Sequence, residues 1–145
     1  MTSLLWLVLS LANREPAAAG VVVVRGIDAA HTLLDLDATP AERAVLLSIG
    51  HHESRWVTNA VNPNGGDCGP TQVRAPETWG SSCAAIFADP AEGYRVALRI
   101  LRHAREVCPG TWGRVLTVYV SGRCDVAPLK AREICAPAGL CTEVY

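Results

Sequence analysis

Apolar residues recur at spacings of three and four along most of the chain, which predicts a mainly helical protein. A hydroxyl cap, a first-turn proline and a capping-box glutamate begin at Thr39, so a long helix should run from there to about Ser54. The same signals recur at Asp89, ahead of a second long helix that should end near Cys108. Shorter helices are expected over residues 27–36, 76–79, 112–121 and 128–134.

The segment after the first long helix has a different composition. Residues 59–69 are rich in Asn, Pro, Gly and Asp, which favour turns, so we expect an irregular loop or short hairpin there. The predicted fold class is therefore mainly α (α+β), with one small irregular β element after that helix. A chain of 145 residues fits one domain, which we assign to residues 27–145.

The N-terminus is apolar and allows two interpretations. The apolar run over residues 4–12, followed by small residues at 17–20, resembles a signal peptide, although no basic residue precedes it. The alternative is a terminal helix packed on the domain. The run is shorter than the roughly 20 apolar residues that cross a bilayer, so no transmembrane span is expected. Residues 1–26 are thus a signal-like or N-terminal apolar segment, in which residues 21–24 form a short strand or a second apolar patch.

Charge and cysteine content narrow the class of protein. The net charge of -1 and the pI near 6.4 provide no basic surface for nucleic acid, which we exclude as a partner. Six cysteines without a CxxC pair or zinc spacing predict disulfides and export, to a periplasmic, extracellular or virion-associated location. The alternative is a cytosolic protein with six reduced, buried thiols. Sequence does not determine the pairing; we expect Cys68 with Cys83, and a C-terminal loop closed by Cys135 and Cys141.

Glu53 is the leading candidate for chemistry. It falls at the end of the first long helix, on the face that carries Val45, Leu46 and Ile49, so its carboxyl should point the way the core residues point. A carboxyl held against apolar neighbours resists ionisation, which suits a general acid. The alternative is a helix-end glutamate that turns to solvent.

A series of short motifs follows Glu53 in a defined order. They are Glu53-Ser54, Ala60-Val61, Gly69 with Gln72, Pro76 with Thr78, and Tyr119 to Gly122 on a late helix. Over roughly residues 40–135 this series resembles the lytic transglycosylases of the lysozyme-like superfamily. The resemblance implies a lysozyme-like fold and peptidoglycan glycan strands as the substrate. It also implies a monomer that uses no metal and no cofactor.

The resemblance implies specific roles. Glu53 would cleave the MurNAc-β-1,4-GlcNAc bond as general acid, and then act as base to close a 1,6-anhydro ring. Ser54 and Tyr119 would hydrogen-bond to its carboxyl and orient it, and Gln72 would line the sugar cleft. Each of these three also has an ordinary interpretation, as a helix-end hydroxyl, a core aromatic and a solvated polar residue respectively.

Departures from the family pattern leave two alternatives. Asp67 is either a turn-former or a second carboxylate that positions water, as in a goose-type lysozyme, which hydrolyses the same bond. Val120 stands where the family usually has Asn, and Pro70 and Thr71 replace the usual Leu-Met. The loss of that Asn favours a non-catalytic cell-wall-binding or virion structural protein of the same fold.

The histidines and tryptophans near Glu53 are candidates for other kinds of site. His51 and His52 precede Glu53, but no later histidine follows at the H-E-x-x-H spacing, so a zinc protease site is not expected. Trp56 and Trp79 flank the turn-rich segment and are candidates to stack on sugar rings, although such aromatics more often belong to the core.

Overall fold

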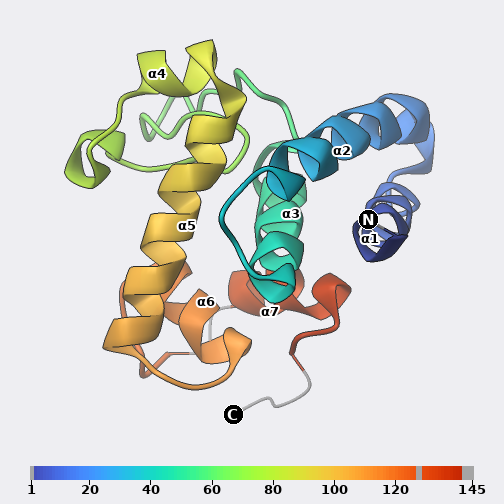
Figure 1. Cartoon of the computed structure of the whole chain (residues 1–145). Helices are drawn as coiled ribbons and strands as arrows, with labels where there is room; N and C mark the ends of the chain where they lie inside the picture. Colours follow the sequence, from blue (N-terminus) through green and yellow to red (C-terminus); the bar gives the residue numbers. More distant parts are fainter. Residues whose placement is uncertain (1, 127–128, 142–145) are drawn as a thin grey trace.

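Helices make up most of the protein (Figure 1), which confirms the predicted mainly α class. The computed structural model describes residues 2–126 and 129–141. The α-helices are α1 (Thr2–Ala12), α2 (Ala19–Leu34), α3 (Pro40–Ser54), α4 (Cys83–Ala88), α5 (Pro90–Val107), α6 (Trp112–Ser121) and α7 (Leu129–Cys135). The 3-10 helices are η1 (Pro16–Ala18), η2 (Pro76–Trp79) and η3 (Ala136–Ala138).

Most of the predicted helices appear close to their expected bounds. The bounds of η2 and α6 agree with the sequence, and α5 ends one residue before Cys108. The expected start of the last helix at Pro128 lies outside the described residues, and α7 begins at Leu129. Helix α4 was not expected from the sequence, because six residues are too few to show a helical period.

The helix expected over residues 27–36 begins earlier, because α2 starts at Ala19 and includes residues 21–24 as helix. Valine is a weak helix former, but Val22 is buried in the core, so packing outweighs propensity. Judged by length and composition alone, the stretch Pro16–Leu34 is long and apolar enough to cross a membrane. Within its most apolar 18 residues, 28 % are buried in the protein. The absence of a transmembrane span stays a prediction.

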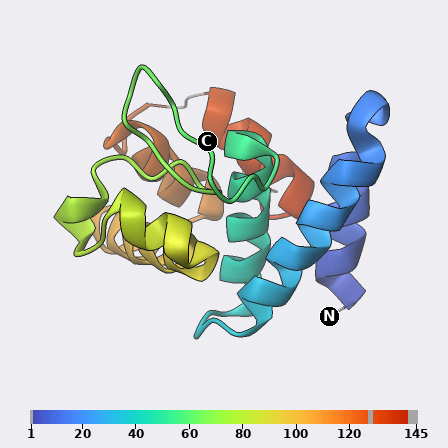
Figure 2. The same ribbon diagram turned by 90° about the horizontal axis from the view of Figure 1, so that it is seen from above.

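The N-terminal helix α1 lies along one side of the molecule (Figure 2) and packs against α2, α3 and η3. Leu7, Val8 and Leu11 are buried in the main core, whereas Trp6 and Leu9 are exposed. This is the arrangement of a terminal helix packed on the domain. The signal-like character of residues 1–26 stays a prediction.

No strand forms among the described residues, so the small β element expected after the long helix does not appear. The loop that follows α3 contains only two isolated bridges, from Val61 to Cys68 and from Cys68 to Val73. Proline and glycine interrupt this loop repeatedly, and neither supports a continuous ladder of strand hydrogen bonds. The segment is therefore an irregular loop.

The central element of the fold is α3, which packs against α1, α2, α5 and α7 (Figures 1 and 2). Val45, Leu46 and Ile49 are completely buried. The predicted capping box begins the helix: Thr39 Oγ1 accepts from the Glu42 backbone N–H at 3.2 Å, and the Thr39 backbone N–H donates to Glu42 Oε2 at 2.7 Å. A capped and enclosed α3 gives Glu53, in its last turn, a defined position.

The chain reverses sharply after α3, at two residues in the left-handed region. Arg55 has φ of 55° and Trp56 has φ of 59°, which is unfavourable for side chains of this size. Tertiary packing compensates, because the Trp56 indole is 2 % exposed and its Nε1 donates to the Leu47 carbonyl at 2.9 Å. Trp56 is thus a core residue that holds the turn beside Glu53.

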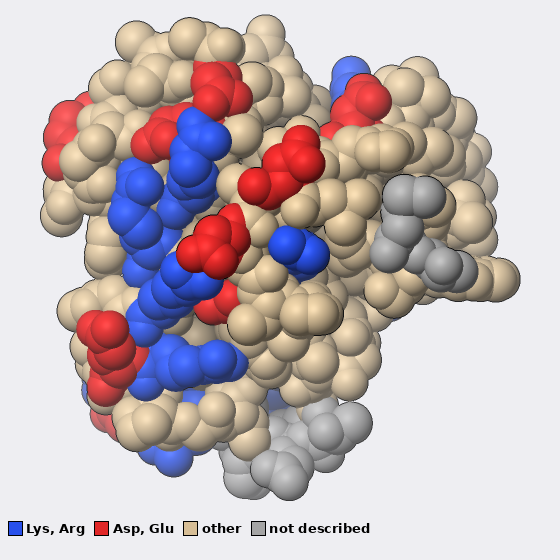
Figure 3. Space-filling view, viewed as in Figure 1, with Lys and Arg blue, Asp and Glu red and all other residues tan. Residues whose placement is uncertain are grey.

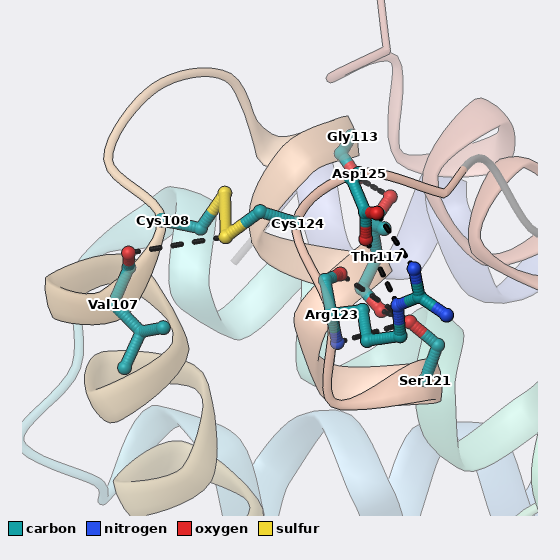
Figure 4. The surroundings of a disulfide bond; sticks show 8 residues. All are labelled: Val107, Cys108, Gly113, Thr117, Ser121, Arg123, Cys124 and Asp125. Atoms are coloured by element: carbon teal, nitrogen blue, oxygen red, sulfur yellow. Dashed lines mark hydrogen bonds and ion pairs between the residues drawn. A yellow bond between two sulfur atoms is a disulfide. The ribbon is translucent and has the colours of Figure 1, made fainter.

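Disulfides join three pairs of segments and leave no cysteine free. The pairs are Cys68–Cys83, Cys108–Cys124 and Cys135–Cys141. The expected Cys68–Cys83 pair is confirmed, and Cys135–Cys141 closes the C-terminal loop. Figure 4 shows Cys108–Cys124, which joins the end of α5 to the segment after α6. A full set of disulfides is typical of a protein from an oxidising compartment.

Figure 3 shows a band of basic side chains over α5, with acidic side chains between them. Arg95 and Arg99 both pair with Glu92, at 2.7 and 3.1 Å. Arg102 pairs with Glu42 at 3.0 Å, which links α5 to the start of α3. These three arginines are therefore balanced by neighbouring carboxylates.

Candidate active site

A groove of about 280 Å³ gathers most of the residues singled out from the sequence. Its walls come from the end of α3, the loop after it, η2, α5, α6 and α7, so segments far apart in the chain meet there. Glu53, Asp67, Gln72 and Tyr119 all line it. Ser54 is the predicted site residue that does not.

Glu53 is sheltered, and its side chain is 13 % exposed. Its carboxylate faces the groove, where Lys130 Nζ lies 2.7 Å from Oε1. His52 Nδ1 lies 4.0 Å from the same oxygen. The apolar surroundings expected from the helix pattern are therefore corrected: α7 packs beside the end of α3 and brings a cation to the carboxylate.

Ser54 bonds to the backbone rather than to Glu53. Its Oγ donates to the Pro70 carbonyl oxygen at 2.7 Å and accepts from the Val57 backbone N–H at 3.0 Å. These bonds tie the loop wall of the groove to the end of α3. Ser54 thus shapes the site through the loop, which differs from the carboxyl-orienting role that the family resemblance implies.

Gln72 lines the groove from a left-handed backbone conformation, with φ of 47°. Its Nε2 donates to the carbonyl oxygens of Ala60 at 3.1 Å and Gly69 at 2.9 Å, so the amide braces the loop. Gly69 has φ of 79°, and a Cβ there would collide with Ile86. This path brings residues 71–74 to the groove wall.

Tyr119 lies near the end of α6, beside Val120, and both line the groove. Burial raises the pKa of the Tyr119 phenol well above its ordinary value, and the negative charge of Glu53 raises it further. The hydroxyl is therefore protonated at neutral pH and able to donate a hydrogen bond. An orienting role toward Glu53 stays a prediction.

Asp67 presents a second carboxylate to the same groove, with its side chain 21 % exposed. Its Oδ2 accepts from Asn62 Nδ2 at 3.2 Å, and Arg74 Nε lies 3.7 Å from Oδ1. The contact with Asn62 supports the turn. Asp67 is thus both part of the turn and a lining residue of the groove.

Lys130, the ion-pair partner of Glu53, was not expected from the sequence. One signal was present, since Lys130 is the only lysine among 13 basic side chains. Lys130 lies far from Glu53 along the chain, so the sequence does not indicate that the two side chains pair. Trp79, a candidate sugar platform, does line the groove, and its ring lies 5.6 Å from that of His103.

In the part of the chain that the structure describes, no group of three or more His, Cys, Asp or Glu side chains is arranged to hold a metal ion. No protein-family model matches the chain, and no curated protein and no solved structure matches it either. The groove's own side chains therefore carry the functional interpretation.

Proposed function

We propose that this protein is a peptidoglycan lytic transglycosylase with Glu53 as its catalytic acid and base. The observation that carries the proposal is the position of Glu53: a carboxylate, 13 % exposed, at the end of a buried helix and on the wall of a groove. Gln72 and Tyr119, two residues of the motif series, line the same groove. Trp79 adds an aromatic surface of the kind that packs against sugar rings.

The proposed reaction uses one carboxyl twice. Protonated Glu53 donates its proton to the glycosidic oxygen as the bond from that oxygen to C1 of MurNAc breaks. The resulting carboxylate takes the proton from the C6 hydroxyl of the same sugar, and the C6 oxygen bonds to C1. Glu53 regains its proton, and no water is consumed.

A goose-type lysozyme is the second candidate, and Asp67 favours it because this carboxylate lines the groove that contains Glu53. Asp67 would direct water to the opposite face of the sugar, and the product would be a reducing end. Mass spectrometry of digested peptidoglycan separates the two, because an anhydro end has one water fewer than a reducing end.

Replacing the carboxyl tests the proposal directly. Glu53→Gln keeps the size of the side chain but supplies no acid, so kcat on purified peptidoglycan should fall about 10²- to 10⁴-fold. Glu77→Gln, at an exposed position on η2, is the matched control and should keep full activity. Release of muropeptides is the readout, and a Glu53→Gln variant as active as the control would refute the mechanism.

A zymogram with purified cell walls tests the third candidate, a non-catalytic binder. An enzyme clears the gel, whereas a cell-wall-binding or virion structural protein binds the walls without clearing them. Val120, the departure that raises this possibility, lines the groove near Tyr119.

The proposed enzyme acts outside the cytosol, where its substrate lies. We propose a periplasmic, extracellular or virion-associated location, which three disulfides support. We further propose a monomer without a transmembrane span. Peptidoglycan glycan strands are its partner, with no nucleic acid, metal or cofactor.

A further inference from the structure

The two oxygens of the Glu53 carboxylate have different surroundings. Lys130 Nζ lies 2.7 Å from Oε1, and His52 Nδ1 lies 4.0 Å from the same atom. Both of these distances are measured to Oε1. The two nitrogen atoms therefore approach the carboxylate at Oε1.

Two side-chain pairs join α7 to the end of α3. Lys130 and Glu133 are one turn apart on α7, and they pair with the consecutive α3 residues Glu53 and His52. The His52–Glu133 pair has Nε2 and Oε2 3.0 Å apart, but its acid is 51 % exposed, against 13 % for Glu53. Lys130 is itself 43 % exposed, so its pair with Glu53 should contribute little to stability, and its effect should lie in the position of the sheltered Glu53 carboxylate.

We propose that Lys130 is a positioning residue for Glu53: its ammonium holds Oε1, so that Oε2 carries the proton that is given to and taken from the substrate. This inference rests on the proposed function of the groove. It adds a residue that the family resemblance does not include.

The charge of Lys130 gives this arrangement an advantage in the first step. As Glu53 gives up its proton, negative charge develops on the carboxyl, and an ammonium already in contact with Oε1 stabilises that charge. A fixed cation does this without reorganisation in the transition state. Lys130 therefore acts through Glu53 and should affect turnover more than substrate binding.

The test measures kcat and KM on soluble peptidoglycan glycan strands. Lys130→Met should lower kcat about tenfold to a hundredfold, with a smaller change in KM, because misplacing a catalytic group by about 1 Å has an effect of this size. Lys130→Arg keeps a charged donor and should restore most of the lost kcat. If Lys130→Met fails to fold, Lys130→Arg still measures how kcat responds to a change in this side chain.

Glu133→Gln is the matched control, since it breaks the neighbouring pair between the same two helices and should leave kcat unchanged. An unchanged kcat in Lys130→Met would overturn the inference. So would an equal loss in Glu133→Gln, because the pairs would then act only by holding α7. A wild-type protein that clears no peptidoglycan would instead refute the proposed function, and the inference with it.

The ion pair itself is testable without turnover. Because the chain has one lysine, reductive methylation with ¹³C-formaldehyde labels only Lys130 and the α-amine. The Lys130 methyl signal should shift in Glu53→Gln and stay in place in Glu77→Gln. A signal that does not respond to Glu53→Gln would show that the pair is absent in solution and would overturn the inference.

Discussion

At the scale of single residues, His51 depends on the fold for its protonation state. Its side chain lies in the last turns of α3, is 8 % exposed, and packs against the Trp56 ring with centroids 4.8 Å apart. Burial, with the positive charges of Arg14 and His52, lowers the pKa of His51 from 6.5 to about 4. The imidazole is therefore neutral at pH 7.

This shift predicts a stability change in mildly acidic solution. Because the folded pKa is depressed, the unfolded chain binds more protons between pH 6.5 and about 4. The stabilisation from neutral His51 is complete above pH 6.5 and is lost as pH falls through about 4. The free energy of unfolding, from urea titrations, should fall by up to about 1.4 kcal/mol per pH unit in this window.

His51→Gln should remove this slope, since glutamine does not titrate. His31→Gln, at an exposed position of α2, is the control and should keep the wild-type slope. The carboxylates with lowered pKa values, such as Glu42, have an ordinary value of 4.5, so the part of the window above that pH isolates the slope due to His51. Equal slopes in wild type and His51→Gln would contradict the assignment.

At the scale of elements, α3 combines local signals with tertiary contacts. Its capping box is formed within one turn of the chain, and Glu42, which completes the box, is 5 % exposed and also pairs with Arg102 of α5. Burial opposes the charge of Glu42, but the bonds from Arg102 and Thr39 outweigh it and lower the pKa of this carboxyl. The start of α3 is therefore tied to α5.

Thr39→Ala should lower the free energy of unfolding by about 1 kcal/mol, because the Glu42 backbone N–H loses its acceptor. Thr111 precedes α6 but makes no side-chain cap bond, so Thr111→Ala is the control. Its effect should stay within about 0.5 kcal/mol. Urea midpoints measure both, and similar losses in the two variants would argue against the cap.

At the scale of the whole molecule, two disulfides close loops of nearly equal length with different contents. Cys68–Cys83 encloses the irregular loop wall of the groove and η2, with a sequence separation of 15. Cys108–Cys124 encloses α6, with a separation of 16. α6 also packs against α5 and α7, whereas the loop has no regular structure of its own.

Replacing either pair by alanines should lower the free energy of unfolding by about 3 kcal/mol, since the closed loops are alike in length. Only the Cys68→Ala, Cys83→Ala variant should also raise KM several-fold, because its groove wall loses a covalent support. Denaturant titrations and kinetics on glycan strands check both effects. Equal KM values in the two variants would show that the groove wall does not depend on its disulfide.

The main elements were predictable because their signals are local. Caps and apolar spacing sufficed for α3, α5 and α6. The order of short motifs singled out Glu53, Gln72 and Tyr119, which line one groove, and Ser54, which does not. The Cys68–Cys83 pair was also predictable. These features depend on residues close in sequence or on a recognisable series of motifs.

Long-range packing decided the rest. Burial of Val22 extended α2 over a valine run whose local preference is for strand, and Ser54 bonds to Pro70 because the loop folds back onto α3. The surroundings of Glu53 depend on α7, whose Lys130 is remote in the chain. The sequence by itself determined α3, α5, α6 and the candidate acid; only the tertiary structure decided where α2 begins and which charge lies beside that acid, because such contacts require the whole chain to be packed.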